Sequence, residues 1–356
     1  MAKKVIVAPL NWGLGHATRC IPVVKTLLQQ GTEVVIAGNG QSLSLLEKQF
    51  PSLESYSLPG FNPSYPAQGK MTLAMLKQLP KFLFQIEREK IAMTKVARKT
   101  MADVIISDNR YGARTSFTKN IFISHQLNIQ VPDSMSSYHS LINKWQATYI
   151  NRFDECWVPD TGSENNLAGK LVQSENIKIP LYFTGILSAI NTQLQPEEKK
   201  YDVVAVLSGP EPQRSMFEGM IIDQLSHSNL KTLVVRGRVN DPQPMPQRGN
   251  MEFLNYASSD AIASLLHKDT IVIARSGYST IMDMVKTGCK AILVPTHGQT
   301  EQEYLATYLS SKNYFVVQQQ SAFNVSEAMQ KTSAIIPMNF TASNNLDALV
   351  NRLLNN

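Results

Sequence analysis

The sequence predicts two α/β domains of the Rossmann-like type that face each other across a cleft. A chain of 356 residues is too long for one ordinary core and suits two domains of moderate size. Short apolar runs of strand length alternate with helix-length segments, which is typical of a parallel sheet covered by helices. This alternation ends at a polar stretch, 191–200, and begins again at residue 201.

The first series starts with an apolar strand at 5–8, a glycine-containing loop, a helix at 18–30 and a second strand at 33–37. Such a strand-loop-helix-strand unit is the usual start of a parallel, helix-covered sheet. Apolar runs at 103–107 and 120–124 are expected to extend that sheet.

The second series contains four further short apolar runs, at 201–207, 232–235, 270–274 and 291–295. We therefore expect an N-terminal domain, a C-terminal domain and a final amphipathic segment that folds back onto the first domain. The predicted bounds are 1–185, 186–338 and 339–356.

Composition excludes several classes of protein. A hydrophobic fraction of 43% is normal for a globular chain and argues against disorder. The sequence has no apolar run near membrane-spanning length and does not start like a secretory leader, so we expect a cytoplasmic protein. Cys20, Cys156 and Cys289 lie far apart, which indicates neither a disulfide framework nor a zinc site.

Positive charge gathers in the N-terminal half. Residues 1–150 hold 17 Lys and Arg against 8 Asp and Glu, and most of the excess lies between Lys70 and Lys99. Such asymmetry indicates an anionic partner or, equally, a solvated helix face. No nucleic-acid recognition motif accompanies it, so we expect no nucleic-acid partner.

The first loop with chemical character follows the first strand. Gly13 and Gly15 allow a sharp turn, but Thr18 stands where a dinucleotide fingerprint has its third glycine. His16 lies where a strand ends and a helix starts, which is where α/β sheets bind ligands. It is either a general base for a hydroxyl group or a side chain that merely bonds the loop.

The second loop directly follows the strand at 270–274 and leads into a helix that ends at Gly288. Backbone amides and hydroxyl groups at this helix N-terminus suit a diphosphate; they come from Ser276, Gly277, Ser279 and Thr280. Asp283, in the first turns, is either an acceptor for ribose hydroxyls or a complement to the helix dipole.

The third loop follows the next strand and should lie beside the second loop. Its Gln302 and Glu303 can bond sugar hydroxyls, although a polar cluster of this kind is also common at exposed helix starts.

Together these loops resemble the inverting glycosyltransferases of the GT-B fold, in particular family 28. That family includes the MurG-like N-acetylglucosaminyltransferases of peptidoglycan synthesis and the diacylglycerol glycosyltransferases of plants and bacteria. The segment 275–304 is similar to the family's donor signature, R-S-G-x-x-T-x-x-[ED] followed by a V-P strand end and a glutamine-containing helix start. The run from Gly13 to His16 is similar to its N-terminal G-x-G-G-H loop.

The resemblance implies transfer, with inversion, of a hexosyl or N-acetylhexosaminyl group from a nucleotide-sugar, by family default a UDP-sugar. It places the ribose on Asp283 and the sugar near Gln302 and Glu303. The donor-binding residues that it implies are Ser208, Gly209, Arg214, Arg275, Ser276, Gly277, Tyr278, Ser279, Thr280, Asp283, Gln302 and Glu303.

The chain departs from the family pattern in three places. The segment 207–214 replaces a glycine-rich donor loop, although Ser208, Gly209 and Arg214 still suit a phosphate. The segment 184–188 lacks an arginine that is frequent there, and the acidic residue is Asp283 instead of glutamate.

In the mechanism that the resemblance implies, His16 deprotonates the acceptor hydroxyl. Asp108, at the end of the 103–107 strand, orients the His16 ring. Asp108 equally suits a simple Asx turn. Acceptor contacts are expected from Gly13, Gly15, His125 and Gln126. The sequence has no D-x-D motif, so we expect no obligatory metal or other cofactor. Helix N-terminal amides, with Arg275 or Arg214, would then stabilise the departing diphosphate. The pair Glu301 and Glu303 keeps a metal-dependent alternative open.

The residues do not identify the acceptor, and a lipid or a glycan stays open; in membrane-associated relatives the acceptor is a lipid. The apolar and basic stretch from Met71 to Ile86 suits peripheral docking on the inner face of an anionic membrane, and equally an ordinary core stripe that Pro80 interrupts.

Two other functions stay open at this point. A non-hydrolysing UDP-sugar epimerase shares the fold and would turn over donor without acceptor. A non-catalytic relative would bind nucleotide-sugar without turnover.

Overall fold

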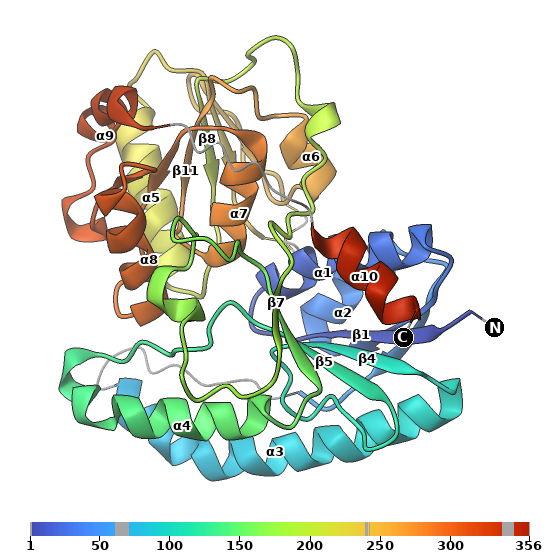
Figure 1. The fold of residues 1–356 in the computed structure, drawn as a ribbon. Coiled ribbons are helices and arrows are strands. Elements are labelled where there is room, and N and C mark those ends of the chain that lie inside the picture. Colours follow the sequence, from blue (N-terminus) through green and yellow to red (C-terminus); the bar gives the residue numbers. More distant parts are fainter. Residues whose placement is uncertain (1, 61–70, 239–240, 242, 337–344, 356) are drawn as a thin grey trace. The chain divides into compact units, whose positions relative to one another are not determined.

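The computed structural model describes residues 2–60, 71–238, 241, 243–336 and 345–355, which divide into two compact units. Unit 1 comprises residues 1–187 and 342–356, and unit 2 comprises 188–341. Each unit contains one parallel sheet with helices packed against it (Figure 1), which confirms the predicted α/β class with two Rossmann-like sheets.

The sheet of unit 1 has seven parallel strands in the order β3-β2-β1-β4-β5-β6-β7. Because the chain adds strands first on one side of β1 and then on the other, the order reverses between β1 and β4. The strands are β1 (Lys4–Pro9), β2 (Glu33–Gly38), β3 (Glu54–Ser57), β4 (Val104–Asp108), β5 (Lys119–Ile123), β6 (Glu155–Val158) and β7 (Leu181–Phe183).

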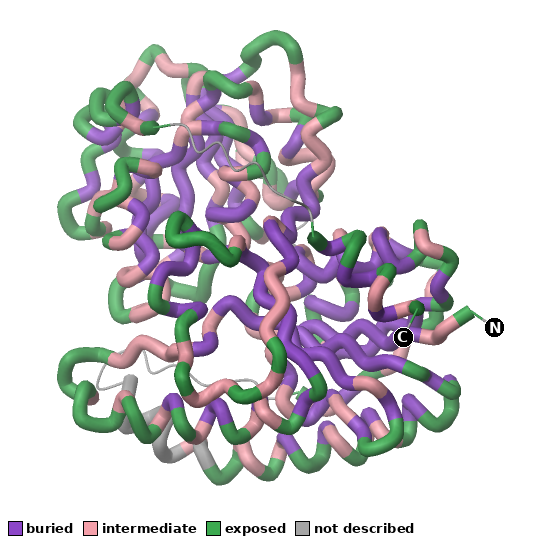
Figure 2. The backbone as a smooth tube through the Cα atoms, in the orientation of Figure 1, coloured by how far each residue is buried: buried purple, intermediate pink, exposed green. Residues whose placement is uncertain are grey.

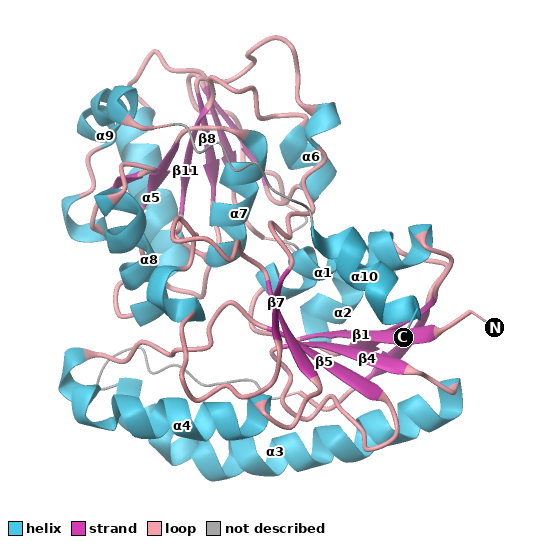
Figure 3. Ribbon diagram, in the orientation of Figure 1, coloured by secondary structure: helices cyan, strands magenta, loops and turns pink. Residues whose placement is uncertain are grey.

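Helices cover both faces of this sheet (Figure 3). One layer consists of α1 (Gly15–Gln29), α2 (Gly40–Gln49) and α10 (Asn345–Asn355), and the other of α3 (Met71–Thr100) and α4 (His139–Ile150). Alternation along the strands supplies both faces with apolar side chains. Ile6 and Ala8 of β1, for example, pack against Met93 and Ala97 of α3.

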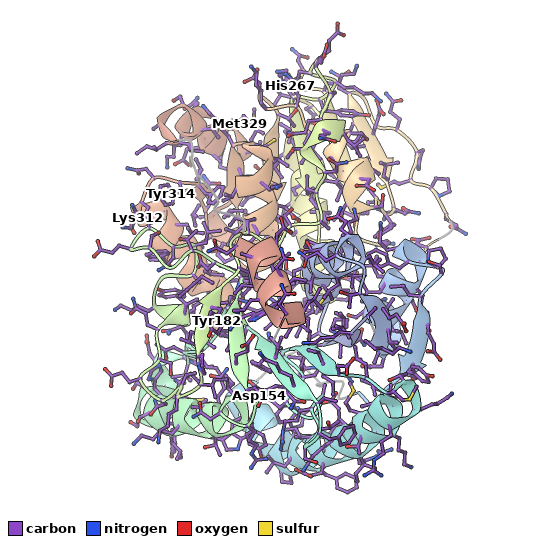
Figure 4. The ribbon with its side chains drawn as sticks, turned by 45° about the vertical axis from the view of Figure 1, so that its right-hand side comes forward. Asp154, Tyr182, His267, Lys312, Tyr314 and Met329 are labelled. Carbon is purple, nitrogen blue, oxygen red and sulfur yellow. The ribbon has the colours of Figure 1, made fainter. Side chains whose placement is uncertain are left out.

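The C-terminal helix α10 packs on α1 within unit 1. The hydroxyl group of Thr26 donates to Asp347 at 3.2 Å, and Lys3 Nζ donates to the Leu353 carbonyl at 2.9 Å. Arg352 bonds Glu155 and stacks 3.8 Å from the ring centroid of Tyr182, which Figure 4 labels. Leu346, Leu349, Val350 and Leu353 are buried below these contacts.

The sheet of unit 2 has six parallel strands in the order β10-β9-β8-β11-β12-β13, with its reversal between β8 and β11. The strands are β8 (Val203–Val206), β9 (Thr232–Val235), β10 (Met251–Leu254), β11 (Ile271–Ala274), β12 (Ala291–Leu293) and β13 (Val316–Val317). The helices are α5 (Gln213–Leu225), α6 (Ser259–Ala263), α7 (Tyr278–Thr287), α8 (Thr300–Ser311) and α9 (Val325–Lys331).

The core of unit 2 lies between the strands and the pair α5 and α9. Phe217 and Ile221 of α5, with Val325 and Ala328 of α9, pack on the strand residues of that face. Figure 2 shows the strands of both units as buried along most of their length. The polar residues at the strand ends, where the predicted loops lie, include buried side chains such as Asp108 and Ser276.

Five outer strands, β3, β6, β7, β10 and β13, were not predicted from the sequence. Two helices also differ from the prediction. Helix α1 begins at Gly15, so His16 belongs to its first turn and not to a preceding loop. Helix α3 continues through Pro80 for 30 residues, although proline removes one helical hydrogen bond. Packing of its later turns, where Met93, Val96 and Ala97 are buried, stabilises the whole helix.

Within the described residues, no helix combines the length and the apolar character needed to cross a bilayer.

The packing of α10 generates a stability prediction for unit 1. Leu353→Ala removes a buried side chain, 1% exposed, and should lower the free energy of unfolding by about 2–5 kcal/mol. Urea titration followed by tryptophan fluorescence isolates this unit, because Trp12, Trp145 and Trp157, the three tryptophans of the chain, all lie in it. The exposed Asn351→Ala change on the same helix is the control, expected within about 0.5 kcal/mol of wild type. Equal stability of both variants would show that α10 does not support the unit.

Candidate active site

The site of unit 1 lies where its strand order reverses. Strands β1 and β4 are parallel neighbours in a register that pairs Pro9 with Asp108. Ligands of open α/β sheets bind at the carboxyl ends of strands at such a reversal. The loop after β1 and the last residue of β4 therefore meet at the expected place.

The loop after β1 is held in one conformation. Gly13 has a φ of 82°, which favours glycine over any residue with a side chain. Helix α2 fixes the loop from the side: Ser42 Oγ donates to the Leu10 carbonyl at 3.0 Å, and its amide donates to Asn11 Oδ1 at 3.1 Å. The first turn of α1, with His16, thus starts from a fixed position.

His16 and Asp108 are in direct contact, as the sequence analysis anticipated for a base and its orienting carboxylate. The Nδ1 atom of His16 lies 2.8 Å from Asp108 Oδ1. The imidazole keeps 16% of its surface exposed, whereas the carboxylate is fully buried. With Nδ1 on the inner side, Nε2 lies on the opposite edge of the ring.

Sequence analysis assigned no role to Arg19, although it is central to this cluster. Both Nε and Nη2 of Arg19 donate to the two oxygens of Asp108. Nη2 also lies 2.7 Å from His16 Nδ1, and Nη1 lies 3.1 Å from Nδ1 of the predicted acceptor-side residue His125. The spacing of three residues between His16 and Arg19 on one helix was the available signal, since such residues share a face.

These contacts shift the protonation equilibria. Burial lowers the pKa of His16, and the Arg19 charge lowers it further, while Asp108 opposes both. Burial raises the pKa of Asp108, but Arg19 and His16 outweigh it and hold that pKa well below its usual range. A neutral imidazole beside an ionised carboxylate follows, which is the starting state of a general base.

Gln126 is the other predicted acceptor-side residue. It is half-buried, and its carbonyl accepts a hydrogen bond from Gln146 of α4 at 2.7 Å. His125 is 5% exposed and contacts the cluster through Arg19. Within unit 1 the structure thus brings His16, Asp108 and His125 together and leaves Gln126 at their margin.

A half-buried group of aromatic rings, which was not predicted, includes two residues that lie close in sequence to His16 and Asp108. Trp12 precedes His16 by four residues, and Tyr111 follows Asp108 by three. Ring centroids lie 6.2 Å apart for Trp12 and Phe82, 6.1 Å for Phe82 and Trp145, and 6.4 Å for Tyr111 and Trp145. We call these four residues the aromatic wall.

In unit 2 the second and third predicted loops lie side by side, which confirms that part of the prediction. Their strands, β11 and β12, are paired, and Ser276 Oγ donates to the Gln302 carbonyl at 2.8 Å. The side chain of Gln302 accepts from the Thr296 amide at 2.9 Å, and Glu303 accepts from the Gly298 amide at the same distance. Both predicted sugar-binding side chains therefore shape the third loop.

Asp283 lies on α7 and accepts a hydrogen bond from Ser188 Oγ at 2.5 Å. Burial of the carboxyl group raises its pKa to about 7, and the Ser188 bond opposes the rise only partly. The residue keeps some exposed surface. Ser188 comes from the segment before β8, so no local sequence pattern joined it to Asp283.

The two arginines predicted at the diphosphate direct their guanidinium groups to the protein. Arg275, 1% exposed, donates to the carbonyls of Val294, Pro295 and Gln213, and burial lowers its pKa to about 10. Arg214 is buried and bonds Glu211 and Glu218, the latter at 2.8 Å. These contacts favour a structural role for both side chains.

The remaining predicted donor residues lie around the first turn of α7. Gly277 is its N-cap, Ser279 and Thr280 are in the first turn, and Tyr278 is buried, so its backbone is the part available to a ligand. Ser208 and Gly209 follow β8, the neighbour of β11. A Cβ on Gly209, whose φ is 107°, would lie 4.0 Å from Thr296 Oγ1, a buried atom without a hydrogen-bond partner in the described structure.

No group of three or more His, Cys, Asp and Glu side chains with the arrangement of a metal site occurs among the residues that the structure describes.

Comparison with known proteins agrees with this fold. Residues 211–349 match the family model described as the glycosyltransferase family 28 C-terminal domain. An uncharacterized glycosyltransferase of Methanosarcina mazei is 23% identical over 338 residues, which cover 87% of this chain and 84% of the relative.

Two solved structures share the fold over nearly the full length of both chains. A UDP-glucosyltransferase from Polygonum tinctorium aligns with a TM-score of 0.63 at 14% identity, over 100% of this chain and 99% of that one. MurG from Acinetobacter baumannii aligns with a TM-score of 0.58 at 13% identity, over 99% of both chains. The protein is a glycosyltransferase of the GT-B fold. More narrowly, it resembles the glycosyltransferases of family 28, because residues 211–349, which include most of the second unit, match the model of that family's C-terminal domain.

The raised pKa of Asp283 predicts a pH effect on stability. An unfolded aspartate has a pKa of about 3.9, so between that value and about 7 the folded chain holds a proton that the unfolded chain has lost. Rising pH therefore destabilises the fold through this group. In calorimetric unfolding, the stability of Asp283→Asn relative to wild type should increase as the pH is raised from 5 to 8.

Asp223→Asn, at an exposed position of α5, controls for loss of one negative charge in the same unit. An Asp283→Asn difference from wild type that does not change with pH would contradict the raised pKa.

Proposed function

We propose that the chain transfers a hexosyl or N-acetylhexosaminyl group from a nucleotide-sugar, in the first place a UDP-sugar, to a hydroxyl group with inversion at the anomeric carbon. The observation that carries this proposal is the contact of His16 Nδ1 with Asp108 at 2.8 Å, at the carboxyl ends of adjacent strands. It supplies a neutral base with Nε2 on its outer edge. The similarity to glycosyltransferases supports the reaction class.

The proposed reaction is one displacement. The acceptor oxygen forms a bond to the anomeric carbon while the bond from that carbon to the diphosphate oxygen breaks. The acceptor proton passes to His16 Nε2, and Asp108 stabilises the imidazolium that results. Attack from the face opposite to the leaving group inverts the anomeric configuration.

On the donor side we propose that the diphosphate binds at the first turn of α7. The amide groups of a first helical turn have no acceptor within the helix, and the helix dipole favours an anion there. Asp283 would accept hydrogen bonds from the ribose, and Gln302 and Glu303 would contact the sugar. The guanidinium groups of Arg275 and Arg214 already bond other protein groups. We therefore propose that the helix amides stabilise the negative charge of the departing diphosphate, and that no metal ion is obligatory.

We propose that the aromatic wall binds the part of the acceptor next to the reacting hydroxyl. It begins at Trp12, in the loop before the helix that carries His16, and its tilted rings offer apolar surface with few hydrogen-bonding groups. This favours an acceptor with an apolar portion over a purely polar glycan.

Peripheral membrane contact through Met71–Ile86 and a cytoplasmic location stay predictions. The side chains of 71–77 and of Leu79 lie outside the described residues. Of the others, Phe84 is 65% exposed, whereas Ile86 is buried.

The donor site can be tested without an acceptor. Calorimetric titration of the purified protein with UDP, GDP and dTDP in the absence of metal should show saturable binding of UDP. Asp283→Ala should weaken it about tenfold or more, since hydrogen bonds to a charged group are lost, while Asp223→Ala should not. Tighter binding of GDP or dTDP would assign a different nucleotide to the donor. If none of the three nucleotides binds, the proposal is contradicted.

The base can be tested once a screen of apolar alcohols, lipids and glycans with UDP-sugars has found an acceptor. His16→Gln and Asp108→Asn should each reduce transfer by about 10²–10⁴-fold, as expected for loss of general base catalysis, and leave the Kd for UDP unchanged. Unreduced transfer in His16→Gln would exclude the mechanism. Turnover of UDP-sugar without acceptor would indicate the epimerase instead.

A further inference from the structure

Arg19 makes contacts that a simple His–Asp pair does not need. The side chain is 2% exposed, rises from α1 one turn after His16 and contacts three ionisable side chains. It pairs with Asp108 through two nitrogens, approaches His16 Nδ1 to 2.7 Å and bonds His125 Nδ1 at 3.1 Å. A buried guanidinium in this position must affect the imidazole.

Two hydrogen-bond arrangements are possible at Nδ1 of His16, and they exclude each other. A neutral imidazole carries one ring proton. If Nδ1 carries it, Nδ1 donates to Asp108 Oδ1 at 2.8 Å and Nε2 is an acceptor. If Nε2 carries it, Nδ1 accepts from Arg19 at 2.7 Å and Nε2 cannot take a proton.

Asp108 decides between these arrangements, because Arg19 fixes its orientation. The paired bonds from Nε and Nη2 of Arg19 hold the carboxylate in plane with the guanidinium, with Oδ1 toward His16. The Sγ atom of Cys20 approaches Oδ2 at 3.6 Å from the same helix. Nη2 of Arg19 also lies 2.7 Å from Nδ1, but it already donates to Oδ1, whereas the ionised Oδ1 is the acceptor that a proton on Nδ1 meets at 2.8 Å. This arrangement favours a proton on Nδ1.

Three charged or ionisable groups face His16: Arg19 from α1, Asp108 from β4 and His125 from the segment after β5. The negative charge of Asp108 is already paired with Arg19, so the positive charge beside the imidazole opposes a second positive charge on the ring. Asp108 alone would favour the imidazolium, and Arg19 reduces that effect.

We propose that Arg19 is a positioning residue for the base: it fixes Asp108 so that His16 carries its proton on Nδ1, and its charge keeps the ring neutral until the acceptor proton arrives at Nε2. This inference rests on the proposed function of His16. Arg19 itself neither gains nor loses a proton in the step. It makes the imidazolium short-lived, which returns the base to its neutral form for the next transfer.

The experiment is side-chain NMR of the six histidines in the intact chain labelled with ¹⁵N, with His16 assigned by its loss in His16→Gln. In wild type, His16 should show the form protonated at Nδ1 and a titration midpoint below that of an ordinary histidine. Arg19→Gln should shift that midpoint upward. Arg19→Lys should keep the midpoint low, because the charge stays, but should give a mixture of the two ring forms, because the paired bonds are lost.

Arg110→Gln is the matched control. Arg110 is also buried in unit 1, but it bonds Glu89 at 2.5 Å and the carbonyls of Pro9 and Pro59. It should leave the His16 midpoint and ring form unchanged. If Arg19→Gln does not fold, the ring form in Arg19→Lys still tests the proposal. A wild-type ring protonated at Nε2, or Arg19 variants identical to wild type, would overturn it.

These outcomes do not depend on glycosyl transfer, so they separate this inference from the proposed function. Where an acceptor is found, kcat at saturating donor adds a second readout. Arg19→Gln should move the acid limb of its pH profile upward, whereas a merely structural role would lower kcat equally at every pH.

Discussion

Parallel pairing of β1 with β4 is the constraint on which the candidate site of unit 1 depends. Its register places Pro9 opposite Asp108, and the chain then turns through Gly13 into the helix that carries His16. Two side chains that are 92 residues apart in sequence thereby come within 2.8 Å. A shift of one residue in β4 would turn Asp108 to the other face of the sheet and remove the contact.

Burial of carboxylates requires compensation, and arginine provides it in both units. Asp108 pairs with Arg19, Glu89 with Arg110, and Glu218 with Arg214. An unpaired buried carboxylate would be strongly destabilising, so each arginine stabilises the loop that it serves. In unit 2, Arg214 and Arg275 hold loops in place, which is why the proposed diphosphate site is the first turn of α7.

The sequence was sufficient for the four inner strands of each sheet and for the contact of His16 with Asp108, because their loops follow strongly apolar runs. It was insufficient for the outer strands β3, β6, β7, β10 and β13, which are short. It was also sufficient for the adjacency of the Ser276 and Gln302 loops, since their strands are consecutive. It was insufficient for Ser188 at Asp283, which depends on a contact 95 residues apart. Nor did it distinguish an arginine that faces a phosphate from one, such as Arg275, that faces backbone carbonyls.

The two halves of the proposed reaction depend on protonation states that burial sets in opposite ways. Burial lowers the pKa of His16 and raises that of Asp283 to about 7. The proposed base, His16, is therefore neutral around neutral pH, whereas Asp283, the proposed ribose ligand, changes its charge near pH 7. Loss of ionised Asp283 on acidification would act on donor affinity, and protonation of His16 on kcat. Because Asp283 has the higher pKa, KM for the donor should rise first as pH falls, while kcat persists to lower pH.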